Sequence, residues 1–373
     1  MPESPLRILQ LYPKGDFFTG AAMQLRDLAA GLVARGHHVT VATPSSDVWP
    51  ERCRAIGVEH VTLPMARPWD PRAAWQLARL IRSRRIQIAH AHKGRARTLA
   101  LIAGLMGGRT ALVLNRGVSF PVTGLRRVGY TTRRVHAVVA VCESIKRGLV
   151  AGGVPAAKIE VVYSGTDLER FHPGVDGAPI RRELGLDRED VLVTQIGVRS
   201  WRGWKELMAA MRTVAARRSR ARLLFVGAPP PRVVEIADHA RAAGLGDRVM
   251  ALGHRDDVPA ILCASDLVVD ASWAGLGITG SIREALACER PVVATAVEGM
   301  PELVRDGETG LLVPPRDPTA LASGILALLD DPTAALTMAR AGRKRVEAHF
   351  SLRAKVDALE ALYRRLADGG RAA

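Results

Sequence analysis

Short apolar runs alternate with segments of helical period along most of the chain. The first of these begins with an apolar run at residues 7–12 and a turn-rich loop at residues 13–20. Leu25, Leu28 and Leu32 then recur at helical spacing. Strands that alternate with helices are typical of a parallel, doubly wound α/β sheet. The strands expected in the first half are residues 7–12, 38–43, 58–63, 86–91, 110–114, 137–141 and 159–163.

The pattern is interrupted at residues 171–179, where two prolines and two glycines occur within nine residues. A second α/β series follows and ends in a helical tail, residues 334–366. We therefore expect two Rossmann-like domains, residues 1–172 and 173–349, that face a central cleft. Ligands of open α/β sheets bind beyond the carboxyl ends of the strands. The strands expected in the second domain are residues 191–197, 222–227, 249–253, 267–272, 291–295 and 310–313.

Positive charge is concentrated in the first half of the 373-residue chain. Lys and Arg total 53 against 37 Asp and Glu, a formal net charge of +16. Residues 1–175 carry +14 of that charge, from 25 basic and 11 acidic side chains. We expect this half to meet an anionic surface or partner. Nucleic acid is excluded as that partner, because only four Tyr and six Phe are available for stacking and no nucleic-acid module is recognised.

Composition excludes several other classes of protein. The four cysteines contain no CxxC pair, which argues against a disulfide framework or a zinc site and fits a reducing cytoplasm. No apolar run reaches the roughly 18 residues that a membrane-spanning helix needs. The N-terminus lacks the basic and apolar regions of a signal peptide. The sequence therefore predicts a cytoplasmic protein.

The segment that carries the clearest chemistry follows the expected strand 267–272. Gly275 and Gly277 allow the backbone to approach a ligand closely, and Thr279, Gly280 and Ser281 then open a helix. The free N–H groups and positive dipole end of that helix would receive a phosphate. Glu284 is expected on its first turn, where its carboxylate would accept hydrogen bonds from ribose hydroxyls. Alternatively, Glu284 only stabilises the helix N-terminus.

Three segments together carry a resemblance to a known family. Residues 284–331 (EALACERPVVATAVEGMPELVRDGETGLL and onward), 253–272 (GHRDDVPAILCASDLVVDAS) and 159–171 (IEVVYSGTDLERF) are similar to family 4, GT-B-fold retaining glycosyltransferases. The resemblance implies transfer of a sugar from a nucleotide-diphosphate sugar with retention of configuration, without cofactor or obligatory metal. It also implies that the final helices, about residues 350–373, pack back on the first domain.

The resemblance assigns cations and a helix end to the donor diphosphate. Arg199 and Arg202, in the loop after strand 191–197, match the family's Arg and Lys, and Gly20 matches its opening-loop glycine. Such groups would stabilise the leaving diphosphate in place of a metal. Lys205 is a weaker candidate because it falls on the following helix. Gly299 and Glu302 lie at a turn on the phosphate side, where Glu298 replaces a common glycine.

One glutamate of the family's donor motif is missing from this chain. Glu284 matches the second glutamate of that motif, but the position eight residues earlier is Leu276, and another alignment places Ala274 there. Thr279, Ser281 and backbone N–H groups are then the candidates for sugar contacts. The missing carboxylate motivates a second hypothesis, a nucleotide-sugar-binding protein that has lost catalysis.

Candidates in the first domain lie at strand ends. Relatives place a histidine after the strand that corresponds to 110–114, whereas this chain has Arg116, which would bind a phosphate or an acidic acceptor, or is merely solvated. His90 and His92 end the strand 86–91 and share one side of it by alternation. His92 is the preferred functional residue, although a structural role is equally open. Lys14 and Asp16 are acceptor-side candidates.

These observations favour a glycosyltransferase that acts on a glycan or lipid-linked acceptor in cell-envelope polysaccharide or glycolipid synthesis. A sugar-nucleotide epimerase on the same fold is an alternative. Arg126 to Arg134 form a basic-aromatic stretch that would lie on an anionic membrane as a peripheral contact. Ordinary solvated helix faces would produce the same pattern.

Overall fold

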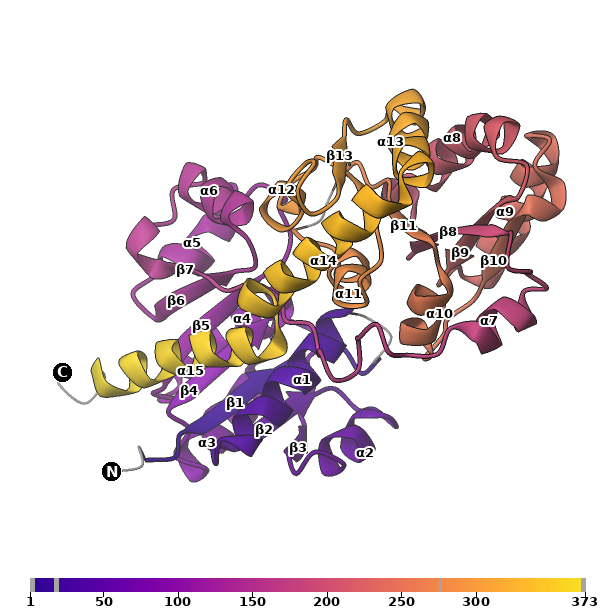
Figure 1. The fold of residues 1–373 in the computed structure, drawn as a ribbon. Coiled ribbons are helices and arrows are strands. Elements are labelled where there is room, and N and C mark those ends of the chain that lie inside the picture. Colours follow the sequence, from indigo (N-terminus) through magenta and orange to yellow (C-terminus); the bar gives the residue numbers. More distant parts are fainter. Residues whose placement is uncertain (1–3, 17–19, 275–276, 370–373) are drawn as a thin grey trace. The chain divides into compact units, whose positions relative to one another are not determined.

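The computed structural model describes residues 4–16, 20–274 and 277–369, and its first half forms a seven-stranded parallel sheet (Figure 1). The strand order is β3-β2-β1-β4-β5-β6-β7. Each strand begins and ends within two residues of the bounds that the apolar runs predict. The central strands are apolar because both their faces are covered, whereas the edge strand β3 (Glu59–Thr62) is partly exposed. The strands are β1 (Arg7–Leu11), β2 (His38–Thr43), β3 (Glu59–Thr62), β4 (Ile88–His92), β5 (Ala111–Arg116), β6 (Val135–Ala140) and β7 (Ile159–Val161).

The helices that cover this sheet include α15 (Leu352–Gly369), which comes from the far end of the chain and packs on α1. The core beneath them contains Tyr12, Trp49 and Tyr363, all fully buried. The other helices are α1 (Gly20–Ala34), α2 (Trp49–Arg54), α3 (Pro71–Ser83), α4 (Lys93–Leu105), α5 (Leu125–Thr131), α6 (Glu143–Ala151) and the 3-10 turn η1 (Ala156–Lys158).

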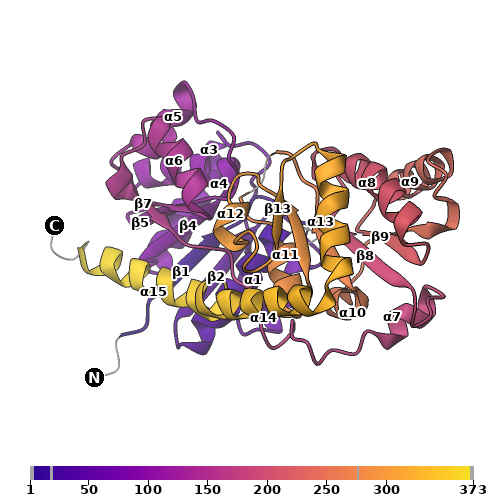
Figure 2. The ribbon, with the colours of Figure 1, turned by 45° about the horizontal axis from the view of Figure 1, so that its top comes forward.

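The second half forms a six-stranded parallel sheet in the order β10-β9-β8-β11-β12-β13. Helix α13 lies beside α8, as Figure 2 shows, and α14 packs on α11. The strands are β8 (Val191–Ile196), β9 (Ala221–Val226), β10 (Val249–Leu252), β11 (Leu267–Asp270), β12 (Val292–Thr295) and β13 (Leu311–Val313). The helices are α7 (Ala178–Glu183), η2 (Ser200–Arg202), α8 (Trp204–Arg217), α9 (Pro230–Ala242), η3 (Gly246–Arg248), α10 (Val258–Ala264), α11 (Gly280–Ala287), α12 (Met300–Leu303), α13 (Pro318–Asp330) and α14 (Pro332–His349).

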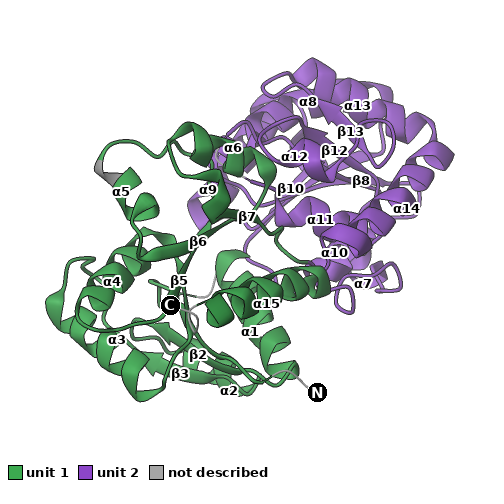
Figure 3. Cartoon of the chain, turned by 90° about the vertical axis from the view of Figure 1, so that its left-hand side faces the viewer, with its two compact units in different colours: residues 1–165, 352–373 green, residues 166–351 purple. Residues whose placement is uncertain are grey.

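The chain divides into two compact units, drawn in Figure 3. Unit 1 comprises residues 1–165 and 352–373, and unit 2 comprises residues 166–351. The boundary thus falls seven residues before the expected one after residue 172. The reason is that Thr166 forms a β-bridge with Ser351, and its N–H donates to the Phe350 carbonyl at 2.8 Å. These contacts join the two ends of unit 2.

Both sheets reverse their strand order at one point, between β1 and β4 in unit 1 and between β8 and β11 in unit 2. The crevice at such a point, beyond the carboxyl ends of the strands, is where doubly wound sheets bind ligands. These two edges therefore locate the candidate site residues. No helix in the described ranges has the length and apolar character needed to cross a membrane.

Candidate functional site

Helix α11 begins just beyond the carboxyl end of β11 and presents an anion-binding end. Thr279 is its N-cap residue and Gly280 its first residue, as the sequence predicts, whereas Gly275 and Leu276 lie outside the described residues. The hydroxyls of Thr279 and Ser272 are buried and have no hydrogen-bond partner among the described residues. Buried hydroxyls ordinarily find a partner. We refer to these two hydroxyls and the orphan N–H groups at the start of the helix as the α11 cradle, since unpaired donors of this kind can receive phosphate oxygens.

Glu284 does not lie on the first turn of α11, contrary to the sequence-based expectation. The helix begins at Gly280, so Glu284 is its fifth residue. The Glu284 carboxylate nevertheless points back toward the start of the helix. Its Oε1 atom lies 3.3 Å from the position that a Cβ would take at Gly280. The half-buried carboxylate therefore lies near the positive end of the helix dipole.

Arg202 is buried and joins three elements of the site, with only 7% of its surface exposed. Its guanidinium forms an ion pair with Asp270 at the end of β11, with Nη1 and Oδ2 2.8 Å apart. Nη2 donates to the Ile196 carbonyl at 2.6 Å and to Ser281 Oγ at 3.3 Å. Arg202 therefore fixes α11 and the loop after β8 to the sheet.

Gly203 allows this close packing of the loop. It adopts a left-handed conformation (φ 64°), and a Cβ there would lie 1.8 Å from the Ala271 carbonyl oxygen. Any other residue would push the loop away from β11. The backbone N–H of Trp273 also donates to the backbone carbonyl of Trp201 at 3.0 Å. This hydrogen bond joins the loops after β8 and β11.

Arg199 lies on the same loop but is exposed. Its guanidinium carbon is 5.7 Å from the centre of the Trp201 ring, and no carboxylate of a described residue lies within 4.0 Å of its nitrogens. Of the two arginines that the resemblance implicates, Arg199 is therefore the one available to a ligand, while Arg202 holds the loop.

The turn after β12 adjoins the glycine-rich segment. The Gly299 N–H donates to the Gly277 carbonyl at 3.1 Å, so the two turns are fixed to each other. Glu298 has a left-handed φ of 55°, the conformation that glycine adopts without cost. Glu302 lies in the short helix α12, and its backbone carbonyl accepts from Arg345.

At the corresponding edge of unit 1, His90 and His92 are buried and stacked, with ring centres 4.4 Å apart. His90 Nδ1 lies 2.6 Å from the Tyr363 hydroxyl, and His92 Nε2 lies 2.8 Å from Gln10 Oε1. Burial lowers the pKa of His90 to about 3, with a smaller contribution from Lys355. Burial also lowers the pKa of His92 well below its usual value. Both rings are therefore neutral near pH 7, and Nε2 of His92 carries the proton that it donates to Gln10.

Arg116, at the end of β5, is held by its own unit. Its guanidinium donates to the Tyr130 hydroxyl at 3.4 Å and to the Phe120 carbonyl, so it positions the loop that follows β5. Gly20 is the exposed first residue of α1, with open space around the position of a Cβ. Lys14 and Asp16 form an exposed ion pair at 3.3 Å.

The sequence analysis missed two partners and one cation at these edges. Asp270 and Tyr363 are the partners, for Arg202 and His90 respectively. The cation is Lys93, directly after β4, which has a left-handed φ of 72° and donates to the Tyr12 hydroxyl at 3.1 Å. Its position immediately after a strand was the one available signal for Lys93.

Comparison with known proteins places this site in a family. Residues 18–170 match the model "Glycosyltransferase Family 4", and residues 191–331 match "Glycosyl transferases group 1". The lipopolysaccharide core biosynthesis mannosyltransferase LpsB of Rhizobium meliloti is 30% identical over 249 residues, which cover 64% of this chain and 68% of LpsB. The chain belongs to glycosyltransferase family 4.

Other similarities of this family 4 member extend the comparison. A D-inositol 3-phosphate glycosyltransferase of Catenulispora acidiphila is 35% identical over 231 residues, 59% of this chain and 54% of that protein. The chain thus spans about half the length of the inositol 3-phosphate enzymes that it matches. The crystal structure of Anabaena Alr3699/HepE in complex with UDP and glucose has a TM-score of 0.82 at 22% identity, covering 96% and 99% of the two chains. That likeness shows the GT-B fold.

The two family matches divide the candidate residues between the two units of the chain. The match over residues 191–331 contains Arg199, Arg202 and the whole α11 cradle. The match over residues 18–170 contains Gly20, His92 and Arg116.

Proposed function

We propose that the protein is a retaining glycosyltransferase that moves a sugar from a nucleotide-diphosphate sugar to a glycan or lipid-linked acceptor, with unit 2 binding the donor. The observation that carries the proposal is the cradle at α11, where the buried hydroxyls of Ser272 and Thr279 lack partners within the described part of the chain. Diphosphate oxygens would accept from both hydroxyls and from the helix N–H groups. The UDP and glucose named in the HepE complex support this class of donor.

In this proposal the protein's own groups stabilise the leaving diphosphate, without an obligatory metal. Arg199 contributes a bidentate cation and α11 contributes its positive end. Arg202 does not contact the phosphates but fixes Ser281 in place, and Glu284 holds the ribose. The leaving phosphate oxygen takes the proton of the acceptor hydroxyl as the new glycosidic bond forms on the same face of the sugar.

The test is an assay with UDP-, GDP- and ADP-sugars and candidate acceptors, measuring release of the nucleoside diphosphate. We expect release that depends on the acceptor, a product with the donor's anomeric configuration by NMR, and activity that persists in EDTA. Acceptor-independent release with an altered sugar would instead indicate an epimerase. Tight donor binding without turnover of any donor would indicate a binding protein that has lost catalysis.

A matched pair of variants ties that activity to the cradle. Thr279→Val removes one buried hydroxyl while keeping the shape of the side chain. It should weaken binding of the nucleoside diphosphate by about ten- to a hundredfold, since one hydrogen bond to a charged group contributes about 1.5–3 kcal/mol. Thr337→Val on α14, whose hydroxyl bonds only to the Thr333 carbonyl at 2.9 Å, is the control. Equal affinity in both variants would contradict the cradle.

For the acceptor, we propose an anionic or lipid-linked glycan of the cell envelope, met by the basic face of unit 1 at a cytoplasmic membrane surface. The names of the relatives include an inositol phosphate and a lipopolysaccharide core. Seven of the ten large apolar side chains that are exposed in the described part of the chain lie between residues 69 and 128. They include Trp69, Trp75 and Phe120, exposed by 74%, 52% and 62%.

These apolar residues lie on α3, α4, α5 and their flanking loops, and α4 packs against both other helices. The same segment carries arginines such as Arg79, which lies over the Trp75 ring, although the side chain of Arg126 is outside the described set. Aromatic and basic groups together bind anionic bilayers. We expect sedimentation with vesicles containing anionic lipid at low salt, and its loss in Trp69→Ser/Trp75→Ser. Val234→Ser, at an exposed apolar site of unit 2, is the control. Indifference of the protein to such vesicles would refute the membrane contact.

A further inference from the structure

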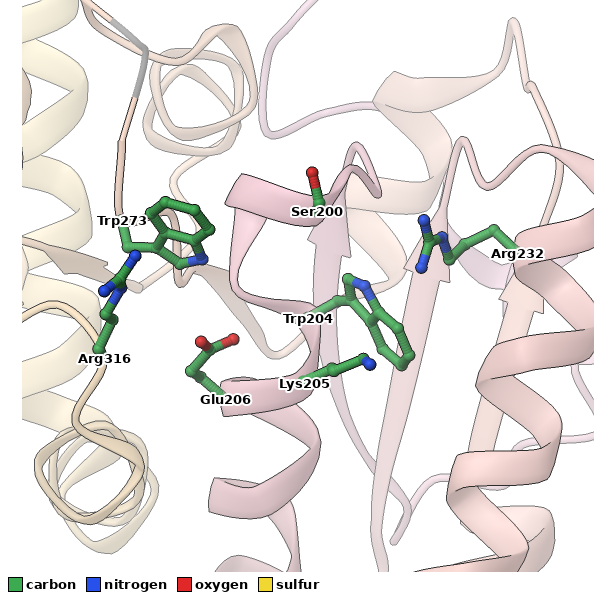
Figure 4. A pocket seen from close by; sticks show the side chains of 7 residues that line it. All are labelled: Ser200, Trp204, Lys205, Glu206, Arg232, Trp273 and Arg316. Atoms are coloured by element: carbon green, nitrogen blue, oxygen red, sulfur yellow. The ribbon is translucent and has the colours of Figure 1, made fainter.

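Unit 2 contains a hollow of about 460 Å³ that is lined by Lys205, the weaker donor-side candidate, but by none of the other donor-side candidates. It is formed by residues from the first turns of α8 and α9 and from the loops after β11 and β13, as Figure 4 shows. Ser200 at its rim belongs to the same 3-10 turn as Arg202. The hollow therefore adjoins the proposed donor cradle but has its own lining.

One wall of the hollow is an indole with a cation stacked on it. The guanidinium carbon of Arg316 lies 4.1 Å from the centre of the half-buried Trp273 ring. Arg316 is exposed, has a left-handed φ of 60°, and has no carboxylate of a described residue within 4.0 Å. A charged group held over an aromatic face without an ion-pair partner is available to an anion.

The opposite wall is supported by Trp204, which is 1% exposed and packs edge-on against Phe225. The charged groups of Lys205 and Arg232 each lie 5.3 Å from its ring centre. Between the two walls lies Glu206, half-buried, with no cation of a described residue within 4.0 Å. The lining thus combines an aromatic ring, a carboxylate and three cations. Lys205 and Arg232 are paired with Glu235 at 3.7 and 2.5 Å, so Arg316 is the lining cation without a carboxylate partner among the described residues.

This combination fits a pyranose better than it fits a bare anion. The C–H face of a sugar packs on an indole ring, a carboxylate accepts from vicinal hydroxyls, and Arg316 pairs with an acidic substituent. A bare anion would be repelled by Glu206 and would make no use of Trp273. We propose that this hollow is a second saccharide site that binds a pyranose bearing an anionic group, such as a uronic acid or a sugar phosphate.

The site is independent of catalysis, so binding alone tests it. Glucuronate, glucose 6-phosphate, glucose and inorganic phosphate are titrated into the full chain at low salt, and binding is followed by saturation-transfer NMR. We expect both acidic sugars to bind at least fivefold more tightly than glucose and than inorganic phosphate, with the advantage decreasing as salt is added. Equal affinity for glucuronate and glucose, or for glucuronate and inorganic phosphate, would overturn the proposal.

Two variants and a matched control locate the binding. Arg316→Gln keeps the length and backbone preference of the side chain but removes the charge, and should weaken glucuronate binding at least fivefold while leaving glucose unchanged. Trp273→Leu should weaken both sugars. Arg241→Gln, which removes an exposed charge elsewhere on α9, should change neither by more than about twofold. An effect of Arg241→Gln equal to that of Arg316→Gln would refute the assignment to this hollow.

UDP serves as the internal reference. We expect UDP to bind the Arg316→Gln and Trp273→Leu variants as it binds the wild type, which also shows that they are folded, and we expect it not to compete with glucuronate. Competition would make the hollow part of the donor site and overturn the proposal. Failure of UDP to bind the wild type would count against the proposed donor and not against the saccharide site.

Discussion

The two sheets share one architecture, but the carboxyl ends at their switch points are filled differently. In unit 1, the side chains of Gln10, His90, His92 and Tyr363 occupy the edge and are bonded to one another. In unit 2, the edge contains the ion pair of Arg202 with Asp270. The buried hydroxyls of Ser272 and Thr279 at this edge have no partner among the described residues. The first edge is a network of four mutually bonded side chains in which one buried nitrogen, His90 Nε2, has no partner among the described residues. The second edge leaves two buried hydroxyls, those of Ser272 and Thr279, for a ligand to satisfy.

The difference shows that the same fold can fill the carboxyl ends of its strands either with neutral, mutually bonded side chains or with a buried ion pair. Helix α15 supplies Tyr363 to the network of unit 1, and burial there keeps both histidines neutral. Charge in unit 1 therefore resides on exposed or half-buried side chains outside the network. In unit 2, by contrast, the charged pair of Arg202 and Asp270 lies buried at the edge itself. Arg202 there supports the loop that presents Arg199.

The largest effect is expected from breaking the buried pair of unit 2. Arg202→Ala leaves Asp270 buried without its cation and should destabilise unit 2 by about 3–5 kcal/mol. Urea unfolding measures the change. In the double variant Arg202→Ala/Asp270→Asn, the stranded charge is removed, so part of the stability should return. A double variant no more stable than the single one would show that the pair does not hold this edge together.

A smaller effect, confined to binding, is expected at the exposed arginine. Arg199→Ala should leave the unfolding curve unchanged, because the Arg199 side chain is exposed and has no ion pair with a described residue, only its contact with the Trp201 ring. It should weaken binding of the nucleoside diphosphate ten- to a hundredfold, since a charge-assisted hydrogen bond contributes about 1.5–3 kcal/mol. Calorimetric titration measures this, with Arg212→Ala, exposed on α8, as the control. Equal losses of affinity in both variants would show that Arg199 acts only through the overall positive charge of unit 2 and not through a contact with the ligand.

The contrast between these two arginines marks the limit of sequence reasoning for this chain. The strands were predictable because most of them are short runs of apolar residues buried on both faces; the edge strand β3, with the sequence EHVT, is an exception. The segment around Arg199 and Arg202 was recognised, but both residues received the same role. The ion pair with Asp270 depends on β11 lying next to β8, and the network of His90 depends on Tyr363 arriving from the C-terminal helix. Contacts between residues so far apart in the chain leave no local pattern. The start of α11 was predicted, but the turn that carries Glu284 was not.

An acid-sensitive contact should distinguish unit 1 from unit 2. Burial alone would raise the pKa of Glu360, but hydrogen bonds from Arg35, Arg364 and His37 lower it to about 2. The folded pKa lies below the ordinary value of 4.5, so the contribution is full above pH 4.5 and is lost as the pH falls toward 2. The expected loss is about 2 kcal/mol.

Glu360→Gln should abolish this part of the pH dependence, as measured by chemical unfolding between pH 5 and 3. Its matched control is Glu347→Gln in unit 2, a more exposed carboxylate paired with Arg343 at 2.8 Å. The control should keep the acid sensitivity of the wild type. An unchanged pH profile in Glu360→Gln would mean that α15 does not hold unit 1 together through this carboxylate.

The smallest effect is expected at Glu298, beside the donor edge of unit 2. Its φ of 55° costs a non-glycine residue about 1 kcal/mol. Glu298→Gly and Glu298→Ala remove the same carboxylate, so the difference in their stabilities isolates the backbone conformation. Glycine also has more freedom to lose on folding, which offsets part of the gain. We therefore expect the glycine variant to exceed the alanine variant by about 0.5 kcal/mol in thermal or urea unfolding. If alanine were the more stable, the turn that bonds Gly299 to Gly277 would not be strained at Glu298.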